Sequence, residues 1–151
     1  MPDERDEYFM RLALEEAEAA FHADEVPVGA VIVQGDAVIA RTHNSRESAN
    51  DPTGHAELLA LRVAAQKLRN WRLSGATLYV TKEPCIMCSG AMVNARLTRL
   101  VYGCRDEKGG AVDSLYNLLS DKRLNHQVQV TSGVLEDECA EILKRFFQER
   151  R

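Results

Sequence analysis

The chain has 151 residues, of which 45% are hydrophobic and 28% are charged, and its formal net charge is −4. This length is typical of one domain that needs no disulfide to hold its core, and the negative charge argues against a protein that binds nucleic acid non-specifically. The acidic start MPDERDEYF lacks the apolar core of a signal peptide, and no window approaches the roughly 18 apolar residues of a membrane span. We therefore expect a single cytoplasmic domain over residues 1–151 that does not enter a membrane.

The first half of the chain predicts a helix, a β-hairpin and a second helix. Apolar residues recur at helical spacing over residues 6–22, which predicts an amphipathic helix. Two apolar runs in VGAVIVQGDAVIART meet at Gly35-Asp36, which is typical of a hairpin. Because both runs are apolar almost throughout, we expect both faces of this hairpin to be covered. Asp51-Pro52-Thr53 resembles a helix start, and residues 56–68 continue as a helix.

The second half alternates strands and helices. ATLYVT, TRLVYG and QVQVT predict three strands. Helices are predicted over residues 84–96, 115–119 and 135–150. Such an alternation predicts a central sheet with helices on both faces.

Metal-ligating residue types gather in the segments DPTGHAE and EPCIMC. His55 falls at or just before a helix start. Cys85 and Cys88 are three residues apart in the first turn of the next helix, so both sulfurs share one face, where the helix dipole favours thiolate. Imidazole and thiolate are ligands that zinc prefers. The sequence therefore predicts a zinc site where two helix N-termini converge.

Glu57 gives this predicted site a catalytic character. Three protein ligands leave a fourth position for water, whereas structural zinc sites normally close with four. Glu57 lies about 200° from His55 around a regular helix, so both can face one metal only if His55 sits at an irregular helix entrance. Glu57 would then be an acid and base beside water whose pKa zinc lowers to about 7. This is hydrolytic chemistry.

Three other interpretations of the cysteines remain open. Four cysteines could form two disulfides, although a cytoplasmic protein favours metal binding or free thiols. Cys104 could be a fourth ligand and make the site structural, although it ends an apolar strand and is typical of core. A redox dithiol would leave His55 and Glu57 unexplained. Cys139 shares a helix face with apolar residues and is predicted to pack in the core.

The motifs H-x-E and P-C-x-x-C together form the signature of zinc deaminases. In addition, EVPVGAVIV, HN, DPTGHAE, EPCIMCSGAM and YGCRDEKGGA follow one another along this chain. In these motifs and their order, the sequence resembles the bacterial tRNA-specific adenosine deaminases over nearly its whole length. The H-x-E and P-C-x-x-C core alone would also fit cytidine, deoxycytidylate or guanine deaminases.

The resemblance implies a three-layer α/β/α cytidine-deaminase-like fold, with a central mixed sheet of five strands and helices on both faces. It implies a homodimer with one zinc ion per subunit, held by His55, Cys85 and Cys88. It also implies hydrolytic deamination of adenosine to inosine at the wobble position of a tRNA anticodon, with release of ammonia. The substrate would be the anticodon stem-loop of a tRNA.

The resemblance further assigns roles around the zinc site. Glu57 would be the proton donor, Asn44 would hold the flipped base or its ribose, and Asp106 would contact a neighbouring anticodon-loop nucleotide. Alternatively, Asn44 is a turn residue at the end of the hairpin and Asp106 a solvated loop charge. Lys82 stands before EPC where a leucine is common in the family.

Several other residues are candidates for RNA contact, because aromatic and basic side chains suit stacking on splayed-out bases and binding of phosphates. These candidates are Arg105, Lys108, Phe147, Arg150 and Arg151, whereas Phe146 is predicted to be core.

Two rival functions remain. One is a deaminase of free bases or nucleotides with the same fold, which would be indifferent to RNA. The other is a structural zinc module or a silent RNA-binding subunit, which would have no need of Glu57.

Overall fold

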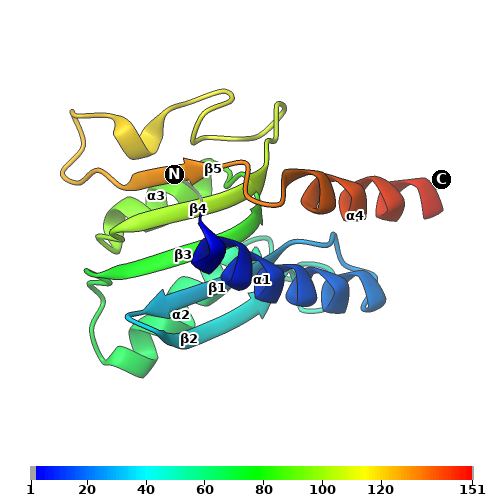
Figure 1. The fold of residues 1–151 in the computed structure, drawn as a ribbon, viewed down its shortest axis with the longest axis horizontal. Coiled ribbons are helices and arrows are strands. Elements are labelled where there is room, and N and C mark those ends of the chain that lie inside the picture. The colour runs from blue at the N-terminus through cyan, green and yellow to red at the C-terminus, as the bar shows by residue number, and fades with distance from the viewer. Residues whose placement is uncertain (1–2, 151) are drawn as a thin grey trace.

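The computed structural model of the protein describes residues 3–150, and a five-stranded sheet lies at its centre (Figure 1). The strand order is β2-β1-β3-β4-β5. β1 is antiparallel to β2 and β3, whereas β3, β4 and β5 run parallel. The sheet is thus mixed, as expected. The elements are α1 (Glu4–His22), β1 (Gly29–Gln34), β2 (Ala37–His43), α2 (Ala56–Leu68), β3 (Ala76–Lys82), α3 (Ile86–Asn94), β4 (Arg99–Cys104), the 3-10 helix η1 (Leu118–Ser120), β5 (Gln129–Ser132) and α4 (Glu136–Glu149).

Both faces of the sheet are covered by helices. Helices α1 and α4 lie on the near face in Figure 1, and α2 and α3 lie behind the sheet. Successive side chains of a strand point to opposite faces, so Val31 and Val33 join the cluster under α1 while Ala30 and Ile32 join the cluster under α2 and α3. This explains why β1 is apolar almost throughout. β2, at the edge of the sheet, is covered only in part. No helix of residues 3–150 combines the length and apolarity that a bilayer span needs.

Helix α3 is shorter than the predicted range 84–96. It begins at Ile86, after Cys85 as the N-cap residue, and it ends at Asn94. The chain cannot continue as a right-handed helix because Arg96 has a φ of 58°. The predicted start and end are therefore wrong by two residues each, but the two cysteines still lie at the first turn.

The predicted short helix over residues 115–119 is wrong in position. The structure instead has one 3-10 turn at Leu118–Ser120. In the segment before it, the backbone N–H groups of Val112, Asp113 and Ser114 donate to the side chain of Glu83 rather than to a helical carbonyl. A contact across 29 or more positions thus decides the local structure here.

The segments that carry the sequence motifs lie together at one end of the strands. β3 and β4 are parallel and end together, with Lys82 opposite Cys104. On the antiparallel side, β1 begins where β2 ends, with Gly29 opposite His43. The segments 44–55, 83–85 and 105–114 therefore leave the sheet at the same end of its strands. In α/β proteins, ligands bind beyond the carboxyl ends of parallel strands.

Candidate active site

His55, Cys85 and Cys88 come together beyond the ends of β3 and β4. Nδ1 of His55 lies 3.5 Å from Sγ of Cys85 and 3.6 Å from Sγ of Cys88. The ligand atoms of all three residues lie within 4.8 Å of one another. His55 and Cys85 are the N-cap residues of α2 and α3, with φ of −82° and −78°. The two helix N-termini thus converge as the sequence predicts.

The spacing of these three residues fits a zinc ion. Zinc lies about 2.3 Å from thiolate sulfur and about 2.0–2.1 Å from imidazole nitrogen, so tetrahedral angles place the nitrogen about 3.6 Å from each sulfur. The two nitrogen–sulfur distances here, 3.5 and 3.6 Å, agree with that value. One imidazole and two sulfurs are also the donor types that zinc prefers. This group can therefore hold a metal ion with a position left for water.

The two cysteines have opposite pKa shifts because they share a hydrogen bond. The contact with Cys88, helped by His55, lowers the pKa of Cys85 to about 4. The pKa of Cys88 is raised, first by the hydrogen bond to Cys85 and then by burial. Metal ligation requires thiolates, so binding of a cation must displace the Cys88 proton.

Glu57 is buried beside this group, with 4% of its surface exposed. His55 precedes the first regular turn of α2, so the angular difficulty of placing both residues at one site does not arise. Burial raises the pKa of the Glu57 carboxyl to about 7. A carboxyl with such a pKa can both accept and donate a proton near neutral pH, as a general acid and base must.

A pocket of about 310 Å³ opens onto these residues. Its volume lies at the lower end of the range for small-molecule sites. Wider hollows of about 520 and 620 Å³ lie elsewhere, but neither is lined by histidine or cysteine. Residues from six segments line the pocket: Glu25, Val26, Val28, Asn44, Arg46, Glu47, His55, Glu57, Lys82, Glu83, Cys85, Asp106 and Phe147.

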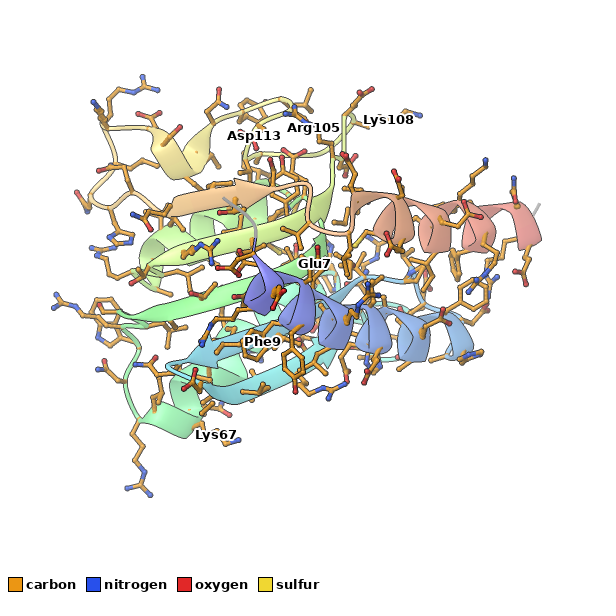
Figure 2. All side chains as sticks on the ribbon, in the orientation of Figure 1. Glu7, Phe9, Lys67, Arg105, Lys108 and Asp113 are labelled. Carbon is orange, nitrogen blue, oxygen red and sulfur yellow. The ribbon has the colours of Figure 1, made fainter. Side chains whose placement is uncertain are left out.

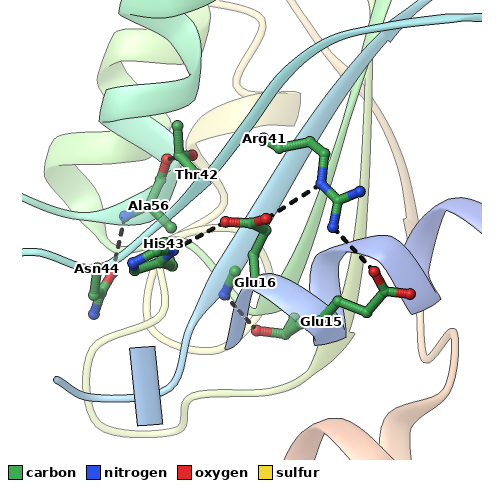
Figure 3. Close-up of polar contacts among 9 residues, drawn as sticks. Glu15, Glu16, Arg41, Thr42, His43, Asn44 and Ala56 are labelled. Atoms are coloured by element: carbon green, nitrogen blue, oxygen red, sulfur yellow. Dashed lines mark hydrogen bonds and ion pairs between the residues drawn. The ribbon is translucent and has the colours of Figure 1, made fainter. Parts of the chain in front are cut away.

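Asn44 lies in this pocket and also holds the start of α2. Its Oδ1 accepts a hydrogen bond of 2.8 Å from the N–H of Ala56, a group that has no partner within the helix (Figure 3). The Oγ1 of Thr42 donates to the carbonyl of Ala56, and His43 contacts Glu16 of α1 at 2.9 Å (Figure 3). Asn44 is therefore more than a turn residue, because it fixes the helix entrance next to His55.

Asp106 also lines the pocket, at the start of the loop 105–114. Its Oδ1 accepts from the N–H groups of Lys108 and Gly109, both at 3.1 Å, and its Oδ2 lies 3.3 Å from Nζ of Lys82. Arg105 and Lys108 extend from the same loop beyond β4 (Figure 2). The lysine that departs from the family pattern thus forms an ion pair with Asp106 in the pocket wall.

Two buried carboxylates of the pocket are absent from the sequence-based prediction. Glu25 and Glu83 are each only 2% exposed, although both are charged residue types. Glu25 accepts hydrogen bonds from the backbone of Glu47 and Ser48. Burial alone would raise the pKa of both carboxyls, but their hydrogen bonds bring it below the ordinary value. A signal for both was present in the sequence. Glu25 stands directly before an apolar segment, and Glu83 stands directly before Pro84-Cys85.

The predicted RNA contacts at the C-terminus have different surroundings in the structure. Phe146 is buried and Phe147 is 48% exposed and lines the pocket, as expected. Arg150, however, forms an ion pair with Asp24, and its guanidinium carbon lies 3.7 Å from the centre of the Phe146 ring. A contact of Arg150 with RNA would therefore compete with this ion pair and stays a prediction, and Arg151 lies outside the described residues.

The fold and this site define a deaminase. A model of the MafB19-like deaminase family matches residues 4–151. A tRNA-specific adenosine deaminase of Bacillus subtilis (strain 168) is 50% identical over 147 residues, which cover 97% of this chain and 91% of the relative. That of Haemophilus influenzae is 49% identical, with 98% and 86% covered. The chain belongs to the MafB19-like deaminases and, among them, to the family of tRNA-specific adenosine deaminases.

Solved structures agree with this assignment. A structure from a study of A-to-I editing by tRNA:A34 deaminases at the wobble position has a TM-score of 0.87 and 50% identity, with 90% of this chain and 99% of that chain covered. A guanine deaminase from Nitrosomonas europaea has a TM-score of 0.81 but only 27% identity, with 93% and 83% covered. The cytidine-deaminase-like fold is thus confirmed, and the sequence is nearer to the tRNA enzymes.

Proposed function

We propose that this protein is a tRNA adenosine deaminase, which hydrolyses adenosine at the wobble position of an anticodon to inosine and ammonia. The observation that carries the proposal is the buried Glu57 next to a His-Cys-Cys group, at the bottom of a pocket that opens between two loops. Identity near 50% to tRNA-specific enzymes supports the RNA substrate. Because tRNA is cytoplasmic in bacteria, we place the protein there, with the whole chain as one deaminase domain.

His55, Cys85 and Cys88 would hold one zinc ion per subunit, and this zinc would lower the pKa of water to about 7. Glu57 takes a proton from the water that attacks C6 of adenine, and a new C–O bond forms. Glu57 then delivers the proton to the amino nitrogen, the C–N bond breaks, and ammonia leaves. Glu57 is placed for both transfers because it is buried directly beside the proposed ligand group.

Two residues at the pocket mouth would hold the substrate. The Oδ1 of Asn44 is occupied by the N–H of Ala56, so its Nδ2 is the group left to donate to the flipped base or ribose. Asp106 would contact a neighbouring nucleotide of the anticodon loop, in competition with its ion pair to Lys82. Unpaired loop bases are the easiest to extrude into such a pocket.

A comparison of substrates tests the proposal. An anticodon stem-loop with adenosine at the wobble position should yield inosine, detected by mass spectrometry. The same adenine placed in the paired stem should react at least about 100-fold more slowly, because unpairing costs a few kcal/mol. Free adenosine, cytidine and guanine should also be poor substrates. If guanine or cytidine reacted as fast as the loop, the protein would be a free-base or nucleoside deaminase, as the similarity to guanine deaminase permits.

We also propose a homodimer that forms through the outer face of α3. A hollow of about 620 Å³ there is lined mainly by apolar residues from α2, α3 and the segment 118–124. Ile86 is 57% exposed and Leu124 38% exposed on this face. Contiguous exposed apolar surface of this kind marks an interaction site, and twofold symmetric dimers are the commonest assembly. Ile86 follows Cys85 in the chain. In a twofold dimer through this face, each subunit would therefore lie close to the active site of the other.

Substituting Leu124→Asp tests the dimer. The wild-type protein should have twice the mass of its chain in light scattering after size exclusion, whereas the variant should be monomeric at the same concentration because a buried carboxylate lacks a partner. Trp71→Asp is the matched control, since Trp71 is 59% exposed but lies outside the hollow. A monomeric wild-type protein would contradict the proposal.

A further inference from the structure

The side chain of Glu83 is the centre of a hydrogen-bond network that the proposed reaction does not use. Its Oε1 accepts from the N–H of Asp106 at 3.0 Å and from the Oγ of Ser114 at 2.5 Å. Its Oε2 accepts from the N–H groups of Val112, Asp113 and Ser114 at 3.2, 2.8 and 2.9 Å. One buried carboxylate thus binds both ends of the loop 105–114.

The loop wraps closely around this carboxylate. A Cβ added to Gly110 would lie 2.3 Å from Cδ of Glu83, so the loop reaches this approach only with glycine. The N–H of Ala111 donates to the carbonyl of Pro84 at 2.9 Å, which attaches the middle of the loop to the same segment. The loop therefore takes its shape from residues 83–84 as well as from its own glycine at position 110.

The same short segment also carries a metal-ligating residue. Glu83 and Pro84 connect β3 to Cys85, whose sulfur lies 3.5 Å from His55. The loop that Glu83 holds carries Asp106, which lines the pocket. Glu83 consequently links the metal group to this pocket wall, alongside the Ala111–Pro84 hydrogen bond and the Lys82–Asp106 ion pair.

We propose that Glu83 is a positioning residue for substrate recognition, which holds the loop 105–114 in register with the metal-ligating segment. The inference rests on the proposed function, because it assigns the loop to the nucleotides next to the reacting adenosine. Glu83 does not touch the reacting atoms, so it acts on substrate binding more than on turnover.

A carboxylate suits this role better than an amide. It is an acceptor only, with about four lone-pair sites, and here it faces five donors. A glutamine would keep one acceptor oxygen, and its NH₂ group would face backbone N–H groups. Some buried donors of the loop would then lack a partner, which is costly.

Glu83→Gln should raise the KM for the anticodon stem-loop on the order of 10- to 100-fold, with a smaller fall in kcat and unchanged metal content. Hydrogen exchange of the 105–114 amides should become faster. Glu83→Asp keeps an acceptor-only group and should recover part of the KM. Gly110→Ala changes the other partner of the Glu83 contact and should raise KM in the same way. If Glu83→Gln does not fold, Gly110→Ala and Glu83→Asp test the inference instead.

Asp6→Asn is the matched control for a buried carboxylate. Asp6 is 1% exposed and bonds to Arg99 and Tyr79 under α1, on the other face of the sheet. This variant should lower the thermal midpoint without changing KM. An unchanged KM in Glu83→Gln, or an equal rise in Asp6→Asn, would overturn the inference. If the wild-type protein acted on a free base instead of the stem-loop, the proposed function would fail, and the same KM comparison would be made with that base.

Discussion

Replacing Glu57 with alanine is expected to abolish most of the activity while the protein keeps its fold and its metal. Proton transfer by a positioned side chain contributes about 10²–10⁴ in rate. In the proposed reaction Glu57 serves both the attacking water and the departing nitrogen, so we expect a loss at the upper end of this range or beyond. Its side chain is not a member of the metal-ligating group, so elemental analysis should find the same metal content as in the wild-type protein.

Glu7→Ala is the control for this experiment. Glu7 lies on the exposed side of α1, on the face of the sheet away from α2 and α3 (Figure 2), and its loss should leave turnover unchanged. Near-normal turnover of Glu57→Ala would contradict the role of the carboxyl in proton transfer. Loss of the metal from that variant would make Glu57 a ligand instead.

Cys88→Ser is expected to remove the metal and, with it, the activity. Cys88 is fully buried, and its sulfur lies 3.6 Å from His55, at the spacing of a tetrahedral zinc site. Loss even of an outer-shell partner lowers metal affinity about 10–100-fold, and a missing ligand should cost at least as much. Metal content measured after dialysis should fall well below the one ion per chain expected for the wild-type protein. The thermal midpoint should fall too, because a bound metal stabilises the folded state.

Cys104→Ser separates this site from a closed four-ligand one. Cys104 is buried at the end of β4, outside the group formed by His55, Cys85 and Cys88, and donates to the carbonyl of Thr81 at 3.5 Å. The variant should keep one metal ion per chain and its activity. Loss of the metal from Cys104→Ser would show that the site is structural. A Cys88→Ser variant that retained its metal would exclude the assigned ligand set.

The sequence alone predicted those features that depend on neighbours in the chain. Helical spacing of apolar residues identified α1, and the apolar runs at Gly35-Asp36 identified the β1–β2 hairpin. The helix starts near His55 and Cys85 are local signals as well, because capping depends on a few adjacent residues. Both residues precede helices that begin at the same end of the strands. The proximity of His55 and Cys85 therefore followed from the motif and the fold class together.

The features that escaped prediction depend on residues far apart in the sequence. Glu83 holds Val112 across 29 positions, and Glu25 holds Glu47 across 22. Arg150 pairs with Asp24 across 126 positions, so an RNA phosphate would compete with this ion pair. Such hydrogen bonds and ion pairs form only after the strand order has placed distant segments together, and periodicity within a segment carries no information about that order. Local chemistry therefore determined where the proposed ligands and the proposed acid–base residue stand, whereas the tertiary structure decided which buried carboxylates shape the pocket around them.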